Sequence, residues 1–226
     1  MAKAKSKVVE AMDELQASIR PFLKERGFRT RARSFNRTTS DAITHVIEFQ
    51  VARFDPPGTQ YYDEIRQNLY GSFTVNIGVF VPELHDYAWK FARELTFVRE
   101  YDCWVRERLG HLGPERQDIW WKLEAIPQQA ADVFERIERD ALPFLSKFET
   151  REAILKQWMQ ESSSPTDSDF AKFTRSREML ACGIILAAQG RRDEAKSCLR
   201  ASLTYKPGHR PSAGIQGLLE KLESGD

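Results

Sequence analysis

The stretch Gly71–Leu84, GSFTVNIGVFVPEL, decides the fold, and Cys103–Trp121, CWVRERLGHLGPERQDIWW, extends the pattern. In the first stretch every second residue from Phe73 to Val81 is apolar. This alternation is typical of a strand that buries one face and leaves the other polar. The polar residues between the apolar ones are Ser72, Thr74 and Asn76.

The same period of two predicts strands over residues 28–37, 43–53, 103–109 and 119–123. In the last two strands, which a Gly-Pro turn region joins, the inward residues are expected to be Val105, Leu109, Ile119, Trp121 and Leu123. Apolar residues at helical spacing predict helices over 7–26, 86–100 and 127–145, the first kinked or locally broken by Pro21. The fold class is therefore predicted as α+β: an antiparallel sheet of about five strands flanked by helices, followed by a C-terminal helical hairpin.

Composition gives no global sign of a charged or lipid partner. The 226 residues carry a net charge of +1, so binding to nucleic acid or to a membrane surface would need a local patch. No stretch approaches the roughly 18 apolar residues of a membrane helix, and the basic N-terminus lacks a signal-peptide core. The 3 cysteines have no paired spacing, which fits reduced thiols, and a cytoplasmic protein without a membrane partner is expected.

Several blocks in a fixed order resemble one known family. They are Gly27-Phe28, the strand end at Phe35–Arg37, VIEFQ at Val46–Gln50, GSFTVNIGVFVPEL, and CWVRERLG followed by a Trp-Trp pair. Together they resemble the domain of unknown function 4304 family over about residues 7–148. The resemblance implies one α+β sheet domain, predicted over 1–148, and it assigns no reaction and no catalytic residue.

The remainder, 149–226, is predicted to be a helical tail. Its polar segment 161–169 separates two helical stretches, and residues 176–209 resemble one tetratricopeptide unit. The first helix places Cys182, Gly183 and Leu186 at packing positions, and Gly190 begins the turn. The second-helix positions are Ala195, Leu199 and Ser202, and Pro207 closes the unit.

A single unit of this kind cannot bury its own apolar face. We expect the face to dock within the chain, although a homodimer through the C-terminal helices or a partner helix is an alternative.

The familiar catalytic and cofactor motifs are missing from the sequence. The four histidines are scattered, and there is no Cys-x-x-Cys pair and no phosphate-binding glycine loop. A metal site from Cys103 and His111 across a bend is conceivable but disfavoured. No metal, no cofactor and no catalytic residue is predicted.

The polar face of the predicted sheet is the best candidate surface, because arginines and tryptophans gather there. Pairing of Glu48 with Arg106 or Arg108 across strands is the plain structural explanation for these arginines. The leading hypothesis is a non-catalytic module that presents this face to a protein partner. An enzyme with an unrecognised site would instead need a deep pocket lined by Glu48, Asn76 and Arg106. The candidate binding residues are Trp104, Arg106, Arg108, Trp120, Glu48 and Asn76.

Nucleic-acid binding is a less favoured alternative. It would use phosphate contacts from arginines on one face of the first predicted strand, beside the tryptophans of the sheet. These arginines are Arg29, Arg31, Arg33 and Arg37.

Overall fold

The computed structural model describes residues 7–52, 60, 68–89, 95–160, 169–204 and 213–224. The chain divides into two compact units. We call the first the sheet unit, and it comprises Met1–Thr39, Thr44–Phe80 and Leu95–Ser146. The second, the helical unit, comprises Ser40–Ile43, Val81–Glu94 and Lys147–Asp226.

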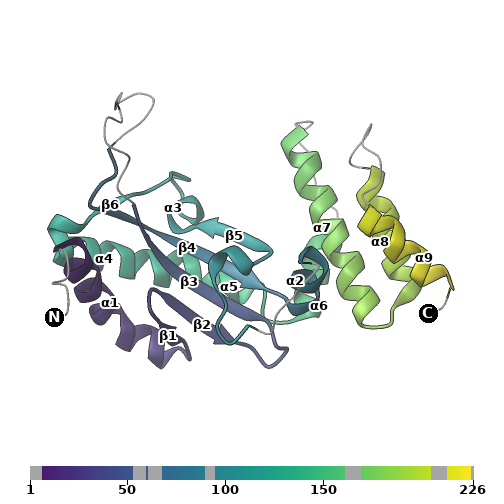
Figure 1. Cartoon of the computed structure of the whole chain (residues 1–226), viewed down its shortest axis with the longest axis horizontal. Coiled ribbons are helices and arrows are strands. Elements are labelled where there is room, and N and C mark those ends of the chain that lie inside the picture. Colours follow the sequence, from purple (N-terminus) through teal and green to yellow (C-terminus); the bar gives the residue numbers. More distant parts are fainter. Residues whose placement is uncertain are drawn as a thin grey trace, which may run out of the picture. The chain divides into compact units, whose positions relative to one another are not determined.

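The sheet unit is built on a 6-stranded antiparallel sheet in the order β1-β2-β3-β4-β5, with β6 also paired to β4 (Figure 1). The α+β class and the antiparallel sheet predicted from the sequence are confirmed. The strands are β1 (Arg29–Arg31), β2 (Ser34–Thr38), β3 (Thr44–Val51), β4 (Ser72–Phe80), β5 (Val105–Arg108) and β6 (Trp121–Lys122).

The single strand predicted over 28–37 is wrong, because these residues form the β1–β2 hairpin. Arg31 pairs with Ser34 across a tight turn, and Ala32 adopts a left-handed backbone with φ of 51°. The sequence hides this turn, because the alternating Arg-Thr-Arg pattern carries no Gly, Asn or Pro at the turn positions.

The two strands predicted at 103–109 and 119–123 are shorter than expected and do not form a hairpin. Both pair with β4: β5 opposite residues 76–79, and β6 opposite Ser72 and Phe73. They run in the same direction, so together they act as one edge strand interrupted by an excursion. That excursion contains α3 (Leu109–Leu112) and returns to β6 at Trp121.

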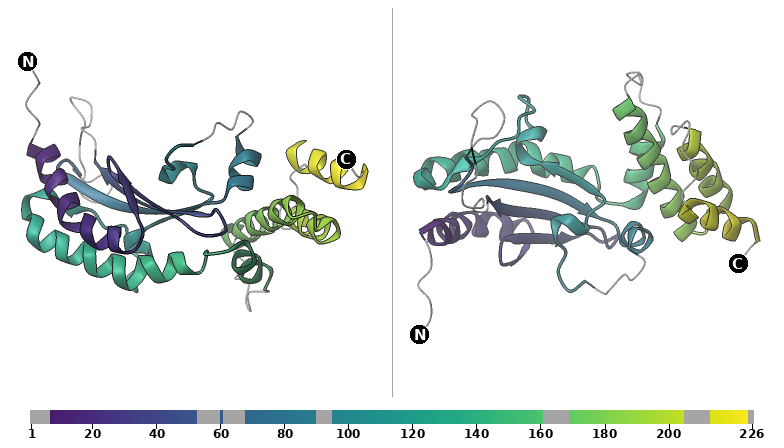
Figure 2. Two further views of the ribbon diagram at one scale, coloured as in Figure 1. Left: turned by 90° about the horizontal axis from the view of Figure 1, so that it is seen from below. Right: turned by 45° about the horizontal axis from the view of Figure 1, so that its top comes forward.

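One face of the sheet carries the core. Phe35, Ile47, Phe49, Phe73 and Ile77 are fully or almost fully buried on it. Two helices, α1 (Lys7–Glu25) and α4 (Ile126–Arg136), lie on that side (Figure 2, left). They contact each other through Phe22 and Phe134, whose ring centres are 4.0 Å apart. The helical elements of this unit are α1 (Lys7–Glu25), η1 (Glu100–Asp102), α3, η2 (Leu123–Ala125), α4 (Ile126–Arg136), the π-helical segment η3 (Ile137–Ala141) and α5 (Leu142–Ser146).

Two helix predictions need correction. Helix α1 is continuous from Lys7 to Glu25, so Pro21 does not break it. The helix expected over 86–100 is wrong: α2 (Pro82–Ala88) begins earlier, and residues 95–99 are not helical. The pattern misled because Leu95 and Val98 pack against the sheet from an irregular segment.

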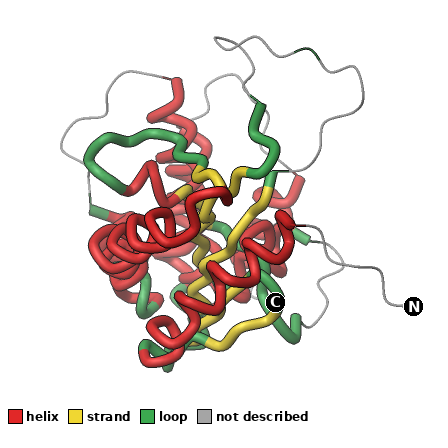
Figure 3. The backbone as a smooth tube through the Cα atoms, turned by 90° about the vertical axis from the view of Figure 1, so that its left-hand side faces the viewer, coloured by secondary structure: helices red, strands yellow, loops and turns green. Residues whose placement is uncertain are grey.

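The helical unit contains α2, α6 (Arg151–Met159), α7 (Asp169–Ala188), α8 (Arg192–Thr204) and α9 (Ala213–Ser224). No strand lies in the described part of this unit, whose regular elements are all helices. Figure 3 draws helices in red and strands in yellow. Helices α7 and α8 form the expected hairpin, with Gly190 in the turn at φ of 75°. A Cβ added to Gly183 would lie 2.6 Å from Leu199 Cγ, so the two helices approach closely.

The hairpin does not stand alone in its unit. Helix α7 contacts α2 and α6, and α8 contacts α9. Arg151, at the start of α6, binds both oxygens of Glu83 in α2 at 2.7 and 2.8 Å. Its backbone N–H also donates to the Asp41 carboxylate at 2.6 Å. The segment 40–43 and helix α2 are thereby tied to α6.

Among the described residues, no helix is long and apolar enough to cross a membrane.

Candidate interaction surface

The second face of the sheet carries the polar residues singled out from the sequence. Directly opposed residues of antiparallel strands point to the same side, so strand register assigns each side chain to a face. Ser34 opposes Glu48, Glu48 opposes Asn76, and Asn76 opposes Arg108. Arg106 joins them through its pairing with Gly78. The prediction that Glu48, Asn76, Arg106 and Arg108 share one face therefore agrees with the register.

Part of this face is covered by the segment 95–103, which ends in η1 and Cys103. Asn36 binds the segment through two hydrogen bonds to the backbone of Val98. Its side-chain amide donates to the Val98 carbonyl at 3.0 Å and accepts from the Val98 N–H at 2.8 Å. Val98 and Cys103 pack on Val46 in a small apolar cluster. Gly78 permits this approach, because a Cβ at that position would lie 2.6 Å from Cys103 Sγ.

Glu48 is occupied by the same segment. Its carboxylate accepts the Glu100 N–H at 2.9 Å and lies 3.5 Å from the Arg99 guanidinium. Arg106 instead binds Glu100 through two hydrogen bonds of 2.6 and 3.1 Å. The expected cross-strand pairing of Glu48 with Arg106 or Arg108 is therefore wrong. A covering segment supplies closer partners, which strand alternation alone does not reveal.

A second group of polar side chains on this face forms a cluster at the β5–β6 edge. Arg108 binds the Asp118 carboxylate at 2.5 Å, and its guanidinium lies 5.1 Å from the centre of the Trp120 ring. The Trp120 indole N–H donates to the same carboxylate at 3.2 Å. Asn76, farther inward, donates to Gln50 at 2.9 Å and is nearly buried.

Two exposed aromatic residues lie in the segments that lead into β4 and β5. Tyr70, just before β4, is 54% exposed, and Tyr101 of η1 is 56% exposed. Trp104 is half-buried, and its backbone N–H continues the β4–β5 pairing by donating to Val79. We define the β5–β6 surface as a set of six residues, of which Arg108 and Trp120 are half-buried and the others are more exposed: Tyr70, Tyr101, Arg106, Arg108, Trp120 and Lys122.

The sequence predicted Arg106, Arg108 and Trp120 for this surface but gave no indication of Tyr70, Tyr101 or Asp118. Tyr101 lies in the short helix η1 and Asp118 in an irregular segment, where strand alternation gives no direction for a side chain.

Residues 19–147 match the model of a known family, the domain of unknown function DUF4304. The chain belongs to the DUF4304 family. Neither the curated proteins nor the solved structures that were searched contain a match. The matched segment includes the whole β5–β6 surface of this DUF4304 protein. It ends before the α7–α8 hairpin, whose resemblance to a tetratricopeptide unit stays a prediction.

The four arginines proposed for nucleic acid do not form one stripe. Arg29 and Arg31 lie on β1, Arg33 lies in the turn, and Arg37 lies on β2. Register puts Arg37 on the core face, where it bonds His45 at 2.9 Å and lies over the Phe28 ring. The expectation of a shared strand face is wrong, because the hairpin turn reverses the chain between Arg31 and Arg37.

No group of three potential metal ligands occurs among the described residues of the DUF4304 chain. His111 lies 3.8 Å from Glu107, whose pKa is raised by partial burial at the sheet edge. Cys103 packs against Val46 instead, and burial raises the pKa of its thiol well above the ordinary value. Cys103 and His111 therefore have separate partners.

Proposed function

We propose that this DUF4304 protein is a non-catalytic interaction module of the cytoplasm, which binds a protein partner through the β5–β6 surface. One observation carries the proposal. The Arg108 guanidinium is held over Trp120 while both contact Asp118. Side chains that are fixed before binding lose little rotamer entropy in a complex, which favours affinity.

The residue types of the surface support a protein partner. Tyrosine, tryptophan and arginine supply most of the energetically dominant contacts in protein interfaces. Tyr70 and Tyr101 are 54% and 56% exposed. The exposed parts of these two rings are accessible to a partner, which supports a contact role.

The charges of the surface favour a protein over a nucleic acid. Arg106 is neutralised by Glu100, and Arg108 by Asp118. Binding to a phosphate backbone draws its affinity from cations that release counterions, and a carboxylate beside each arginine opposes that. The β5–β6 surface therefore gives no specific support to the nucleic-acid alternative.

Two further parts of the proposal concern the cellular compartment and the docking of the C-terminal hairpin. Cys103, Cys182 and Cys198 are buried and unpaired, which supports a reducing compartment such as the cytoplasm. The contacts of α7 and α8 with their neighbours support docking of the tetratricopeptide-like hairpin within the chain. A homodimer through the C-terminal helices remains the alternative, and light scattering of the full chain distinguishes a 26.1 kDa monomer from a dimer.

Quantitative affinity purification tests the surface. The double variant Arg108→Ala with Trp120→Ala removes the preformed cluster and is expected to reduce recovery of specific partners at least tenfold, about 1.4 kcal/mol or more. Arg139→Ala, which removes another exposed, carboxylate-paired arginine from the same unit, is the matched control and should retain them. Circular dichroism verifies that each variant is folded. An unchanged set of partners in the folded double variant contradicts the proposal.

A further inference from the structure

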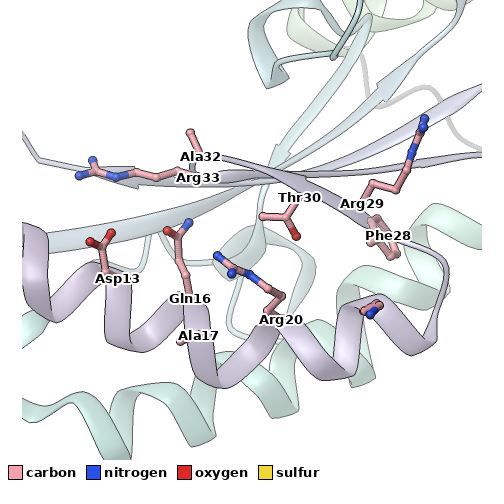
Figure 4. Close-up of a pocket in the computed structure, with 10 residues that line it drawn as sticks. Asp13, Gln16, Ala17, Arg20, Phe28, Arg29, Thr30, Ala32 and Arg33 are labelled. Atoms are coloured by element: carbon pink, nitrogen blue, oxygen red, sulfur yellow. The ribbon is translucent and has the colours of Figure 1, made fainter.

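A groove lies between helix α1 and the strand β1 at the opposite edge of the sheet (Figure 4). Its volume is about 860 Å³, within the range of small-molecule sites. One wall comes from α1 and the other from the segment 28–33. The lining residues are Asp13, Gln16, Ala17, Arg20, Lys24, Phe28, Arg29, Thr30, Ala32 and Arg33.

The residues of α1 that line the groove lie on a different face of the helix from its core residues. Its core residues, including Leu15, Ile19 and Leu23, are fully buried. The groove residues recur at three- and four-residue steps from Asp13 to Arg20, as one helical face requires. With a rise of 1.5 Å per residue, the wall from Asp13 to Lys24 extends for roughly 16 Å.

The cations of the groove lack the carboxylate partners that six other arginines of the unit have. Within the described chain, no carboxylate forms an ion pair with Arg20, Lys24, Arg29 or Arg33. Four cations against the single carboxylate of Asp13 give the lining a formal charge of +3 (4 − 1). In contrast, ion pairs engage Arg26, Arg99, Arg106, Arg108, Arg136 and Arg139.

Gln16 gives a second, independent indication of a ligand. Its side chain is only 3% exposed, yet the amide nitrogen has no hydrogen-bond partner among the described residues. A buried donor without an acceptor is costly, so an acceptor is expected in the groove. Figure 4 shows Asp13 and Gln16 projecting from α1 toward the turn that carries Arg33, and Arg20 projecting into the same gap.

We propose that this groove binds a small ligand that carries two or three linked phosphate groups. The net charge of the lining matches such a chain better than it matches a single phosphate. Arginine forks and the Gln16 amide both donate to phosphate oxygens. Phe28, the aromatic residue of the lining, is only 2% exposed, so its ring offers no platform for base stacking. A nucleic-acid strand is therefore disfavoured.

Some residues of the groove are placed to contact a ligand directly, and others lie at its edge. Thr30 points toward α1, whereas Arg29 extends away from it in Figure 4. We assign phosphate contacts to Gln16, Arg20 and Arg33, and a weaker, long-range contribution to Arg29. Arg31 provides a matched control, because it donates to Thr96 and does not line the groove.

Isothermal titration calorimetry of the full chain with pyrophosphate and with tripolyphosphate tests the proposal. We expect saturable 1:1 binding that weakens with added salt. Arg20→Gln and Arg33→Gln should each weaken it about tenfold, whereas Arg31→Gln should change it less than threefold. Gln16→Leu should weaken binding while leaving thermal stability equal or higher, because it removes a buried unpartnered amide. That combination separates a ligand contact from a structural role.

Three outcomes overturn the proposal. One is no binding of either polyphosphate at low salt. Another is an equal loss of affinity in Arg31→Gln and Arg20→Gln, which would indicate only a diffuse charge effect. The third is tighter binding of a single-stranded RNA or an acidic peptide that depends on Arg20 and Arg33. None of these outcomes bears on the β5–β6 surface, because the variants lie at the other edge of the sheet.

Discussion

The Glu48 carboxylate accepts a hydrogen bond of 2.9 Å from the backbone N–H of Glu100, a residue 52 positions later in the chain. The bond fastens the segment 95–103 to the sheet. Glu48→Ala should leave the Glu100 N–H and the Arg99 guanidinium without this acceptor. We expect it to lower the free energy of unfolding by about 1–3 kcal/mol, measured by urea denaturation.

The neighbouring variant Gln50→Ala is the control for Glu48→Ala. Gln50 lies on the same strand and face but is exposed and bonds only Asn76 among the described residues. Its loss should cost less than Glu48→Ala. Equal stability of Glu48→Ala and the wild type would contradict the structural role and return Glu48 to the candidate binding residues.

Gly78→Ala should also disturb the segment 95–103. The new methyl group would meet Cys103 Sγ at 2.6 Å and Cys103 Cβ at 3.0 Å. We expect a loss of about 1–3 kcal/mol from overpacking. In a Cys103→Ala background the closest clash disappears, so the same substitution should cost less. A double-mutant cycle by urea denaturation measures this coupling, and strict additivity would exclude the contact.

Two glycine-to-alanine substitutions in the helical unit should act in opposite directions. Gly183→Ala drives a methyl group against Leu199 at 2.6 Å and should destabilise the α7–α8 hairpin. Gly217→Ala in α9 meets nothing within 4 Å and should stabilise by up to about 1 kcal/mol through helix propensity. Differential scanning calorimetry compares the two melting temperatures. A gain in stability for Gly183→Ala would mean that the helices do not approach as closely as described.

Arg151 should be needed for the integrity of the helical unit. It binds Glu83 bidentately and also reaches Asp41, and Glu83 is only 13% exposed. Arg151→Ala leaves that carboxylate largely buried and unpaired, at a cost of about 3 kcal/mol in thermal or urea unfolding. Arg151→Lys keeps the charge but loses the planar fork, so its cost should be intermediate. A lysine variant as stable as the wild type would show that charge alone suffices.

Thiol chemistry should report on folding and on pH. Burial raises the pKa of Cys182 to about 12 and raises those of Cys103 and Cys198. The native thiols should therefore react slowly with iodoacetamide at pH 8, and all three should react rapidly in guanidinium chloride.

The same shifts predict a loss of stability in alkali. Above roughly pH 8.5 the unfolded thiols ionise while the folded ones stay protonated, so their contribution falls as pH rises and is fully present below that value. In the wild type, the urea midpoint should therefore be lower at pH 10 than at pH 7. The difference should shrink in Cys182→Ala. An unchanged difference would assign the alkaline effect to other groups.

Much of the architecture was predictable because strand and helix periods are local properties. The alternation from Phe73 to Val81 predicted β4, and the spacing of Val8, Met12, Leu15 and Ile19 predicted α1. The β1–β2 turn was missed, since Ala32 has a left-handed backbone that its residue type does not announce. The non-helical path at 95–99 was missed because a few apolar residues fit more than one period.

The sequence by itself determined which side chains share a face of β3, β4 and β5, and that Gly183 stands where two helices approach. Only the tertiary structure decided their partners. Glu48 binds the segment 95–103 and not Arg106, and Arg20 and Arg33 line one groove although they lie on different elements. The physical reason is that periodicity arises from the backbone of one element, whereas partners are set by contacts between residues far apart in the chain. Ion pairing and burial depend on those long-range contacts.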